Sequence, residues 1–182
     1  LDEKPIQLHD HVREPEGLRP GKCRKVDYEY KRNGTCNAFC CVEPKQGTYS
    51  VKITDHRKAE DFAEQVQAIA EKYPDAVKID LVMDNLNTHS VKSLIKRFGE
   101  EEADRIWNRF EIHYTPKHGS WLNQAEIAIN MYARQCLGKS RIPNKELLTK
   151  KTAHWVRYIN EKKVVIQWKF TKQKAREKFN YP

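Results

Sequence analysis

The 182-residue sequence lacks any long hydrophobic run. Without roughly 18 consecutive apolar residues it offers no candidate for a membrane-spanning helix, so we expect no membrane partner. The first residues, Leu1 to Lys4, also lack the basic and then apolar pattern of a secretory signal peptide. Only five cysteines are present, an odd number without the spacing of a disulfide framework. Together these absences predict a cytoplasmic protein with reduced thiols.

Charge is the first positive feature, because it is unevenly distributed along the chain. Residues 1–138 hold 21 Lys and Arg against 22 Asp and Glu, whereas residues 139–182 hold 13 against 3. The formal net charge of +9 therefore comes entirely from the C-terminal segment. A localised basic segment is typical of proteins that bind nucleic acid. A Lys-rich helix that only keeps a protein soluble has the same composition, so charge alone leaves both interpretations open.

The patterning of apolar residues predicts a mixed α/β fold. Strands are expected at 1–8, 35–42, 48–53, 77–83 and 110–114. Helices are expected at 58–72, 88–98, 101–108, 120–137 and 144–160, with a basic helix after residue 170. Asn33-Gly34 predicts a hairpin turn, and the apolar run 77–83 is typical of a strand covered on both faces. Early hairpins and later strands separated by helices imply antiparallel and then parallel pairing, with helices on the sheet faces.

Three carboxylates are candidate catalytic residues. Asp84 follows the predicted strand 77–83, at the end where α/β sheets open onto ligand crevices, but a lone Asp there equally suits a helix cap. Glu126 falls on the apolar stripe of the helix predicted from Ser120, where a carboxylate is costly unless it is paired or binds a metal. Asp2, in the first strand, taken alone is an ordinary terminal residue. Carboxylates with little Cys or His support suit Mg²⁺ or Mn²⁺.

Two other clusters are weaker metal-site candidates. The His-Asp-His tripeptide at 9–11 has an alternate-residue spacing that a metal can use on a strand, but no third ligand lies at a telling distance. Cys36, Cys40 and Cys41 lie on a predicted core strand, where cysteine behaves as a small hydrophobic residue. They lack the second pair that a zinc site requires.

Two longer motifs carry a family resemblance. The stretch 81–89, LVMDNLNTH, and the stretch 113–126, HYTPKHGSWLNQAE, closely resemble bacterial DDE transposases of the insertion-sequence-630 family, within the mariner superfamily. The opening LDEKP at 1–5 resembles the first catalytic strand of that family, and residues 168–178 resemble its C-terminal end. The resemblance implies a ribonuclease H-like fold, with a mixed sheet of about five strands flanked by helices.

The resemblance also implies an activity. Asp2, Asp84 and Glu126 match the three acidic positions of the family. The resemblance implies that each is a ligand of one shared pair of Mg²⁺ ions, for which Mn²⁺ can substitute. The implied reaction is cleavage of DNA at a transposon end, followed by attack of the freed 3′-hydroxyl on target DNA, typically at TA. The alternatives are a hydrolytic ribonuclease H-like nuclease that cuts without joining, and a DNA-binding remnant that does not cut.

Further positions are expected to orient the carboxylates or to contact DNA. They are Asn85, Asn87, His89, Lys117, His118, Asn123, Lys162, Lys163, Lys172, Lys174 and Arg176. Trp121, in the second motif, is a candidate packing anchor beneath the site.

The sequence departs from the family pattern in two respects. Asp84 and Glu126 are 42 positions apart, which is longer than usual in the mariner branch, and the extra residues fall around 99–108. We expect a catalytic-domain fragment that lacks the N-terminal helix-turn-helix region of the family and has a truncated first strand. We expect the core over 1–138 and a basic helical extension of the same domain over 139–182. The expected partners are transposon-end and target DNA, with a homodimer in the full-length protein, at the nucleoid of a bacterium.

Overall fold

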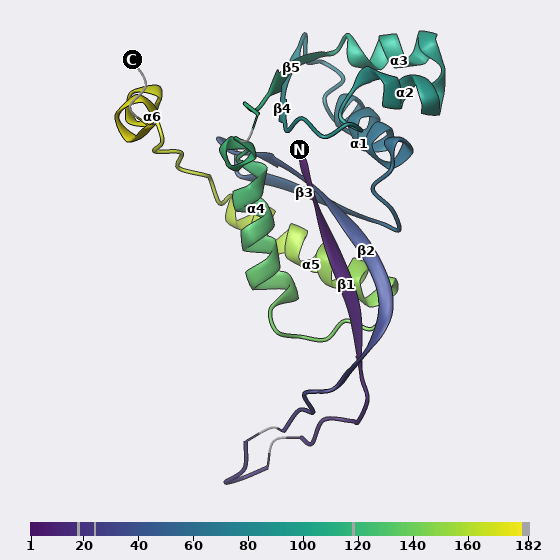
Figure 1. Cartoon of the computed structure of the whole chain (residues 1–182), viewed down its shortest axis with the longest axis vertical. Helices are drawn as coiled ribbons and strands as arrows, with labels where there is room; N and C mark the ends of the chain where they lie inside the picture. Colours follow the sequence, from purple (N-terminus) through teal and green to yellow (C-terminus); the bar gives the residue numbers. More distant parts are fainter. Residues whose placement is uncertain (18, 24, 118, 180–182) are drawn as a thin grey trace.

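Figure 1 shows the computed structural model, which describes residues 1–17, 19–23, 25–117 and 119–179. The strands are β1 (Asp2–His11), β2 (Tyr30–Glu43), β3 (Thr48–Thr54), β4 (Ile79–Met83) and β5 (Phe110–Tyr114). The helices are α1 (Ala59–Lys72), α2 (Val91–Phe98), α3 (Glu100–Trp107), α4 (Ala125–Tyr132), α5 (Lys145–Lys162) and α6 (Lys172–Phe179). Within the described ranges, no helix has the length and hydropathy needed to cross a membrane.

Strands β1, β2 and β3 form an antiparallel sheet with β2 in the centre. The hairpin turn predicted at Asn33-Gly34 is wrong, because β2 runs through both residues. The register slips by one residue opposite them, between Gln7 and His9 of β1. The two residues therefore lie in a β-bulge, where the φ of +101° at Gly34 suits a glycine. Pairing with β1 on both sides of the bulge outweighs the local turn preference.

Strands β4 and β5 pair in parallel and bury one face against α1, α2 and α3. Leu81 and Met83 point into this core, where they join Phe62 and other side chains of the helices. The expectation that this strand is covered on both faces is wrong, because the alternate residues Asp80 and Val82 are exposed. Helices α4 and α5 pack on the three-stranded sheet instead.

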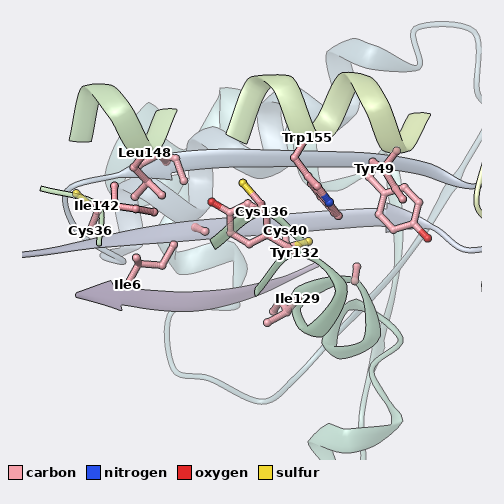
Figure 2. Packing of buried hydrophobic residues seen from close by; sticks show 14 of the residues in the cluster. Ile6, Cys36, Cys40, Tyr49, Ile129, Tyr132, Cys136, Ile142, Leu148 and Trp155 are labelled. Carbon is pink, nitrogen blue, oxygen red and sulfur yellow. The ribbon is translucent and has the colours of Figure 1, made fainter. Parts of the chain in front are cut away.

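A second core lies between the three-stranded sheet and helices α4 and α5 (Figure 2). Tyr132 of α4 and Trp155 of α5 are at its centre, with their rings 5.2 Å apart in an edge-on arrangement. Cys40 and Cys136, both free thiols, are buried beside them. Leu148 and Trp155 lie beyond residue 138, so α5 completes this core, and a boundary at that residue stays a prediction.

The two sheets meet at the N-terminus of the chain (Figure 1). The ammonium nitrogen of Leu1 donates to the carbonyl oxygen of Val82 at 2.9 Å, which places the start of β1 beside β4. Next to this junction, a cavity of about 330 Å³ is lined by Leu1, Phe39, Ile79, Asn123 and others from β2, β4 and α1. The structure therefore has a mixed α/β fold in two sheets, and a continuous five-stranded sheet stays a prediction.

The segment after α5 crosses the molecule and leads to α6. Tyr49 donates its hydroxyl to the carbonyl of Val164 at 2.7 Å, and the N–H of Ile166 donates to the carbonyl of Pro44 at 2.9 Å. Residues 44–47 form the turn between β2 and β3, closed by the N–H of Gly47 donating to the carbonyl of Glu43 at 2.9 Å, with Gly47 at a φ of +67°. Figure 1 shows α6 standing apart from the other helices, so its basic side chains are exposed to solvent.

Candidate active site

Asp2 is a buried carboxylate at the start of β1, only 6 % exposed. Its Oδ1 accepts a hydrogen bond from the N–H of Glu3 at 2.8 Å, and its Oδ2 lies 3.4 Å from the side-chain nitrogen of Asn123. The same nitrogen donates to the carbonyl of Leu1 at 2.9 Å. Asn123 therefore ties the segment before α4 to the start of β1, and its role in orienting the carboxylates stays a prediction.

The electrostatics of Asp2 connect it to the other two predicted acids. The pKa of Asp2 is raised from 3.8 to about 6, chiefly by burial and against a lowering by its hydrogen bond from the backbone of Glu3. The negative charges of Glu126, Asp84 and Glu3 contribute to this rise. Two carboxylates that are distant in sequence thus act on Asp2 through space, because a nearby like charge disfavours ionisation.

Asp84 comes directly after β4, and its side chain is 28 % exposed. Neighbouring groups hold this strand end in place. The N–H of Thr115 donates to the carbonyl of Met83 at 3.0 Å, and Asn85 donates its side-chain N–H to the carbonyl of Thr115. The N–H of Leu86 donates to Asp84 Oδ1 at 3.2 Å. Asn85 therefore fixes the loop that carries Asp84, while Asp84 itself stays open to solvent on one side.

His89 is a buried residue in contact with Asp84 and is 1 % exposed. Its Nε2 hydrogen-bonds Glu3 Oε1 at 2.7 Å, while its Nδ1 hydrogen-bonds the backbone carbonyl oxygen of Asp84 at 3.3 Å and lies 2.7 Å from Asp84 Oδ1. The ring of Phe62 stacks on the imidazole at 4.7 Å between centroids. Burial acts to lower the pKa of His89, but the hydrogen bond and negative charge of Glu3, together with Asp84, raise it overall. A backbone carbonyl and an ionised carboxylate only accept hydrogen bonds, so these two partners favour a ring that donates from both nitrogens.

Glu126 lies in the first turn of α4. The prediction that this helix begins at Ser120 is wrong, because residues 120–122 form a short 3₁₀ turn and α4 begins at Ala125. Glu126 is therefore partly exposed at a helix start rather than buried on a stripe within a long helix. A carboxylate is favourable there, since the first turn of a helix carries a partial positive charge. The N–H of Glu126 donates to the carbonyl of Asn123 at 3.1 Å, which links it to the residue beside Asp2.

The remaining predicted positions lie farther from these three acids or on the surface. Asn87, Lys117 and the predicted basic residues of the C-terminal segment are exposed, and His118 lies outside the described residues. Trp121 is 46 % exposed and contacts the ring of Phe170 at 5.1 Å between centroids. Trp121 is therefore not a buried anchor, because the 3₁₀ turn directs it toward the C-terminal segment.

The structure also reveals possible metal-binding side chains that the sequence analysis did not single out. Glu3 is one, with a side chain that is 4 % exposed. Asp80, Glu111 and His113 are others, and they form the one group of three possible metal ligands within 4.8 Å of one another among the described residues. All three are exposed, and His113 Nε2 is 2.8 Å from Asp80 Oδ1. The signal for this cluster was the alternation of Glu111 and His113 on one strand, but the pairing with β4 was needed to bring Asp80 beside them.

A family model described as DDE superfamily endonuclease matches residues 1–149. The chain belongs to this family. The match covers β1, β4 and α4, the elements that carry or precede Asp2, Asp84 and Glu126, and it ends within α5. No curated protein and no solved structure matches the chain significantly. Membership of the DDE endonucleases agrees with the expectation of a transposase-type nuclease domain that uses divalent metal and acts on DNA.

Proposed function

We propose that this DDE endonuclease domain is the catalytic domain of a transposase of the insertion-sequence-630 family. In this proposal Asp2, Asp84 and Glu126 together hold two Mg²⁺ ions. The observation that carries it is the junction of β1 with the start of α4, where Asp2 Oδ2 lies 3.4 Å from the side-chain nitrogen of Asn123 and the carbonyl of Asn123 accepts from the N–H of Glu126. Burial and the charges of Glu126 and Asp84, among others, raise the pKa of Asp2 to about 6. Three carboxylates from separate parts of the chain thus share one electrostatic environment. Placing three negatively charged carboxylates near one another costs free energy, and bound cations offset this cost.

The donor set fits the proposed ions. Mg²⁺ prefers carboxylate oxygens and water as ligands, and the three acids supply hard oxygen donors only. His89 does not add a nitrogen ligand, because both of its ring nitrogens lie 2.7 Å from carboxylate oxygens. When bound, such ions lower the pKa of an attacking water and neutralise charge on the phosphate.

The protein's own residues divide the remaining work. Asp2, Asp84 and Glu126 bind the ions, and Asn123 holds Asp2 against the segment before α4. Exposed Lys117 and the basic C-terminal segment, with Lys162, Lys163, Lys172, Lys174 and Arg176, contact the DNA backbone in this proposal. The reaction is cleavage at a transposon end and transfer of the 3′-end to a TA target, by a dimer on paired ends.

Cleavage of a supercoiled plasmid in Mg²⁺ or Mn²⁺ tests the proposal. We expect metal-dependent nicking that is lost in Asp84→Asn and Glu126→Gln. The matched control is Asp80→Asn, which changes an exposed acid on β4, the strand that precedes Asp84. This variant should nick the plasmid at the wild-type rate. Nicking that survives Asp84→Asn, or that disappears in Asp80→Asn, would contradict the assignment and in the second case would point to the Asp80 cluster.

Joining of an oligonucleotide 3′-end to the plasmid separates the alternatives. A transposase domain should produce joined products that are lost in the same variants. Nicking without joining would instead favour a hydrolytic nuclease of the same family. Retained DNA binding with neither nicking nor joining would identify a DNA-binding remnant and refute the proposed activity.

A further inference from the structure

Two consecutive carboxylates at the start of β1 point to opposite sides of the strand. Asp2 lies toward Asn123, whereas Glu3 meets His89. The side chain of Glu3 is 4 % exposed and that of His89 is fully buried. Asp2 is a proposed metal ligand, but Glu3 has no part in the function proposed above.

The buried pair is not explained by stability. Removing a carboxylate from water costs several kcal/mol, and a buried ion pair is often no more stable than well-packed apolar side chains of similar volume. Phe62, a member of the adjoining apolar core, already stacks on the ring, so an apolar side chain would suit this place. The Glu3–His89 pair is better explained by its contact with Asp84.

The imidazole of His89 contacts the carboxylate of Asp84. His89 Nδ1 hydrogen-bonds the backbone carbonyl oxygen of Asp84 at 3.3 Å and lies 2.7 Å from Asp84 Oδ1, and the N–H of Leu86 reaches the same Oδ1 at 3.2 Å. Both contacts with the carboxylate use Oδ1, which leaves Oδ2 to face a cation. Because Glu3 anchors the far nitrogen of the ring at 2.7 Å, the orientation of the imidazole is set from β1.

We propose that Glu3 and His89 are positioning residues that orient the Asp84 carboxylate, with Glu3 acting through the His89 ring. This inference rests on the proposed function, since it gives a role to the oriented carboxylate. It makes the Asp84 geometry depend on the docking of the two sheets, because Glu3 belongs to β1 and Asp84 follows β4. Groups that hydrogen-bond to metal ligands typically change metal affinity about 10- to 100-fold when they are removed.

Mn²⁺ affinity, measured by electron paramagnetic resonance without DNA, is the first readout. All variants carry Asp80→Asn, so that the exposed Asp80 cluster does not add a second site. Glu3→Gln keeps the length and the accepting oxygen but removes the charge, and we expect it to weaken Mn²⁺ binding at least about 10-fold. The matched control is Glu64→Gln, which removes an exposed carboxylate paired with Arg97 and should change nothing. Equal affinity in the two variants would overturn the proposal.

Two substitutions of His89 separate positioning from simple filling of space. The amide nitrogen of asparagine is as many bonds from Cα as Nδ1, so His89→Asn retains a donor toward Asp84. The amide nitrogen of glutamine corresponds to Nε2, so His89→Gln retains only the donor toward Glu3. Positioning predicts tighter Mn²⁺ binding in His89→Asn than in His89→Gln. A purely structural role predicts the reverse, because glutamine fills the buried space better. If neither variant folds, Glu3→Gln alone decides.

A nuclear magnetic resonance readout keeps this inference separate from the proposed function. The Nδ1 proton of His89 should be visible in the metal-free protein, since the ring is buried and Nδ1 meets Asp84 Oδ1. We expect exchange with water to broaden this signal in Glu3→Gln. Failure of the wild-type protein to bind Mn²⁺ would refute the proposed function, while an unchanged signal in Glu3→Gln would refute positioning.

Discussion

Replacing Asp2 by asparagine removes a buried charge while keeping an oxygen that accepts the hydrogen bond from the Glu3 N–H. The substitution should alter the pH dependence of folding in a defined direction. The pKa of Asp2 is raised to about 6 in the folded protein from 3.8. The folded state therefore binds this proton more tightly than the unfolded state. The resulting stabilisation is complete below about pH 4 and is lost as the pH rises through about 6.

The size of the effect follows from this difference in pKa. One pKa unit corresponds to about 1.4 kcal/mol, so the full difference is about 3 kcal/mol. Asp84 and Glu126, which contribute to the shift, are partly exposed, and solvent screening reduces their part to leave about 2 kcal/mol. In the absence of divalent metal, Asp2→Asn should thus gain about 2 kcal/mol of unfolding free energy relative to wild type between pH 4 and pH 7.5.

Urea unfolding of both proteins in a chelator, at several pH values, measures this difference directly. Magnesium added at pH 7.5 should then stabilise the wild-type protein and leave Asp2→Asn unaffected, since the variant lacks one proposed ligand. A difference in unfolding free energy that does not change with pH would refute the reasoning. It would mean that Asp2 is well solvated or paired with a cation in solution.

Three further predictions concern other parts of the molecule. Deletion of residues 172–182 removes the cations of α6. The slope of the logarithm of the DNA association constant against the logarithm of the salt concentration should become shallower by about 3. Filter binding at several salt concentrations would measure this slope. Gly47→Ala should lower the melting temperature, because a Cβ there would lie 2.6 Å from the backbone of Lys163 and φ is +67°. Thr152→Val leaves the Tyr132 hydroxyl without its 2.6 Å partner and should cost about 1–3 kcal/mol in chemical unfolding, with no change in DNA binding.

Elements with strong local signals were predictable from the sequence. The strand at 110–114 was predicted with its observed bounds, and α5 begins one residue after the start predicted at 144, where the side chain of Asn144 accepts from the N–H of Leu147 at 2.9 Å. Errors arose where pairing or packing overrides a local preference. Asn33-Gly34 has the chemistry of a turn but lies in a bulge, because β1 pairs on both sides of it.

The candidate site was only partly accessible to sequence reasoning. Asp84 and Glu126 could be singled out by their places at a strand end and in a motif, and their roles remain proposals. Glu3 could not be singled out, because alternation along β1 does not say which face a helix will cover. Asp80 escaped notice because its partners Glu111 and His113 come from a strand about thirty positions later, and only parallel pairing brings them together.

The sequence by itself determined the local elements, the concentration of positive charge after residue 138 and the motifs of the DDE endonuclease family. These properties depend on neighbours along the chain. Only the tertiary structure decided that His89 would be buried between Glu3 and Asp84, and that the charges of Asp84 and Glu126 would raise the pKa of Asp2. Burial and Coulomb interactions depend on distance in space, which is set when β1 docks beside β4 and α4.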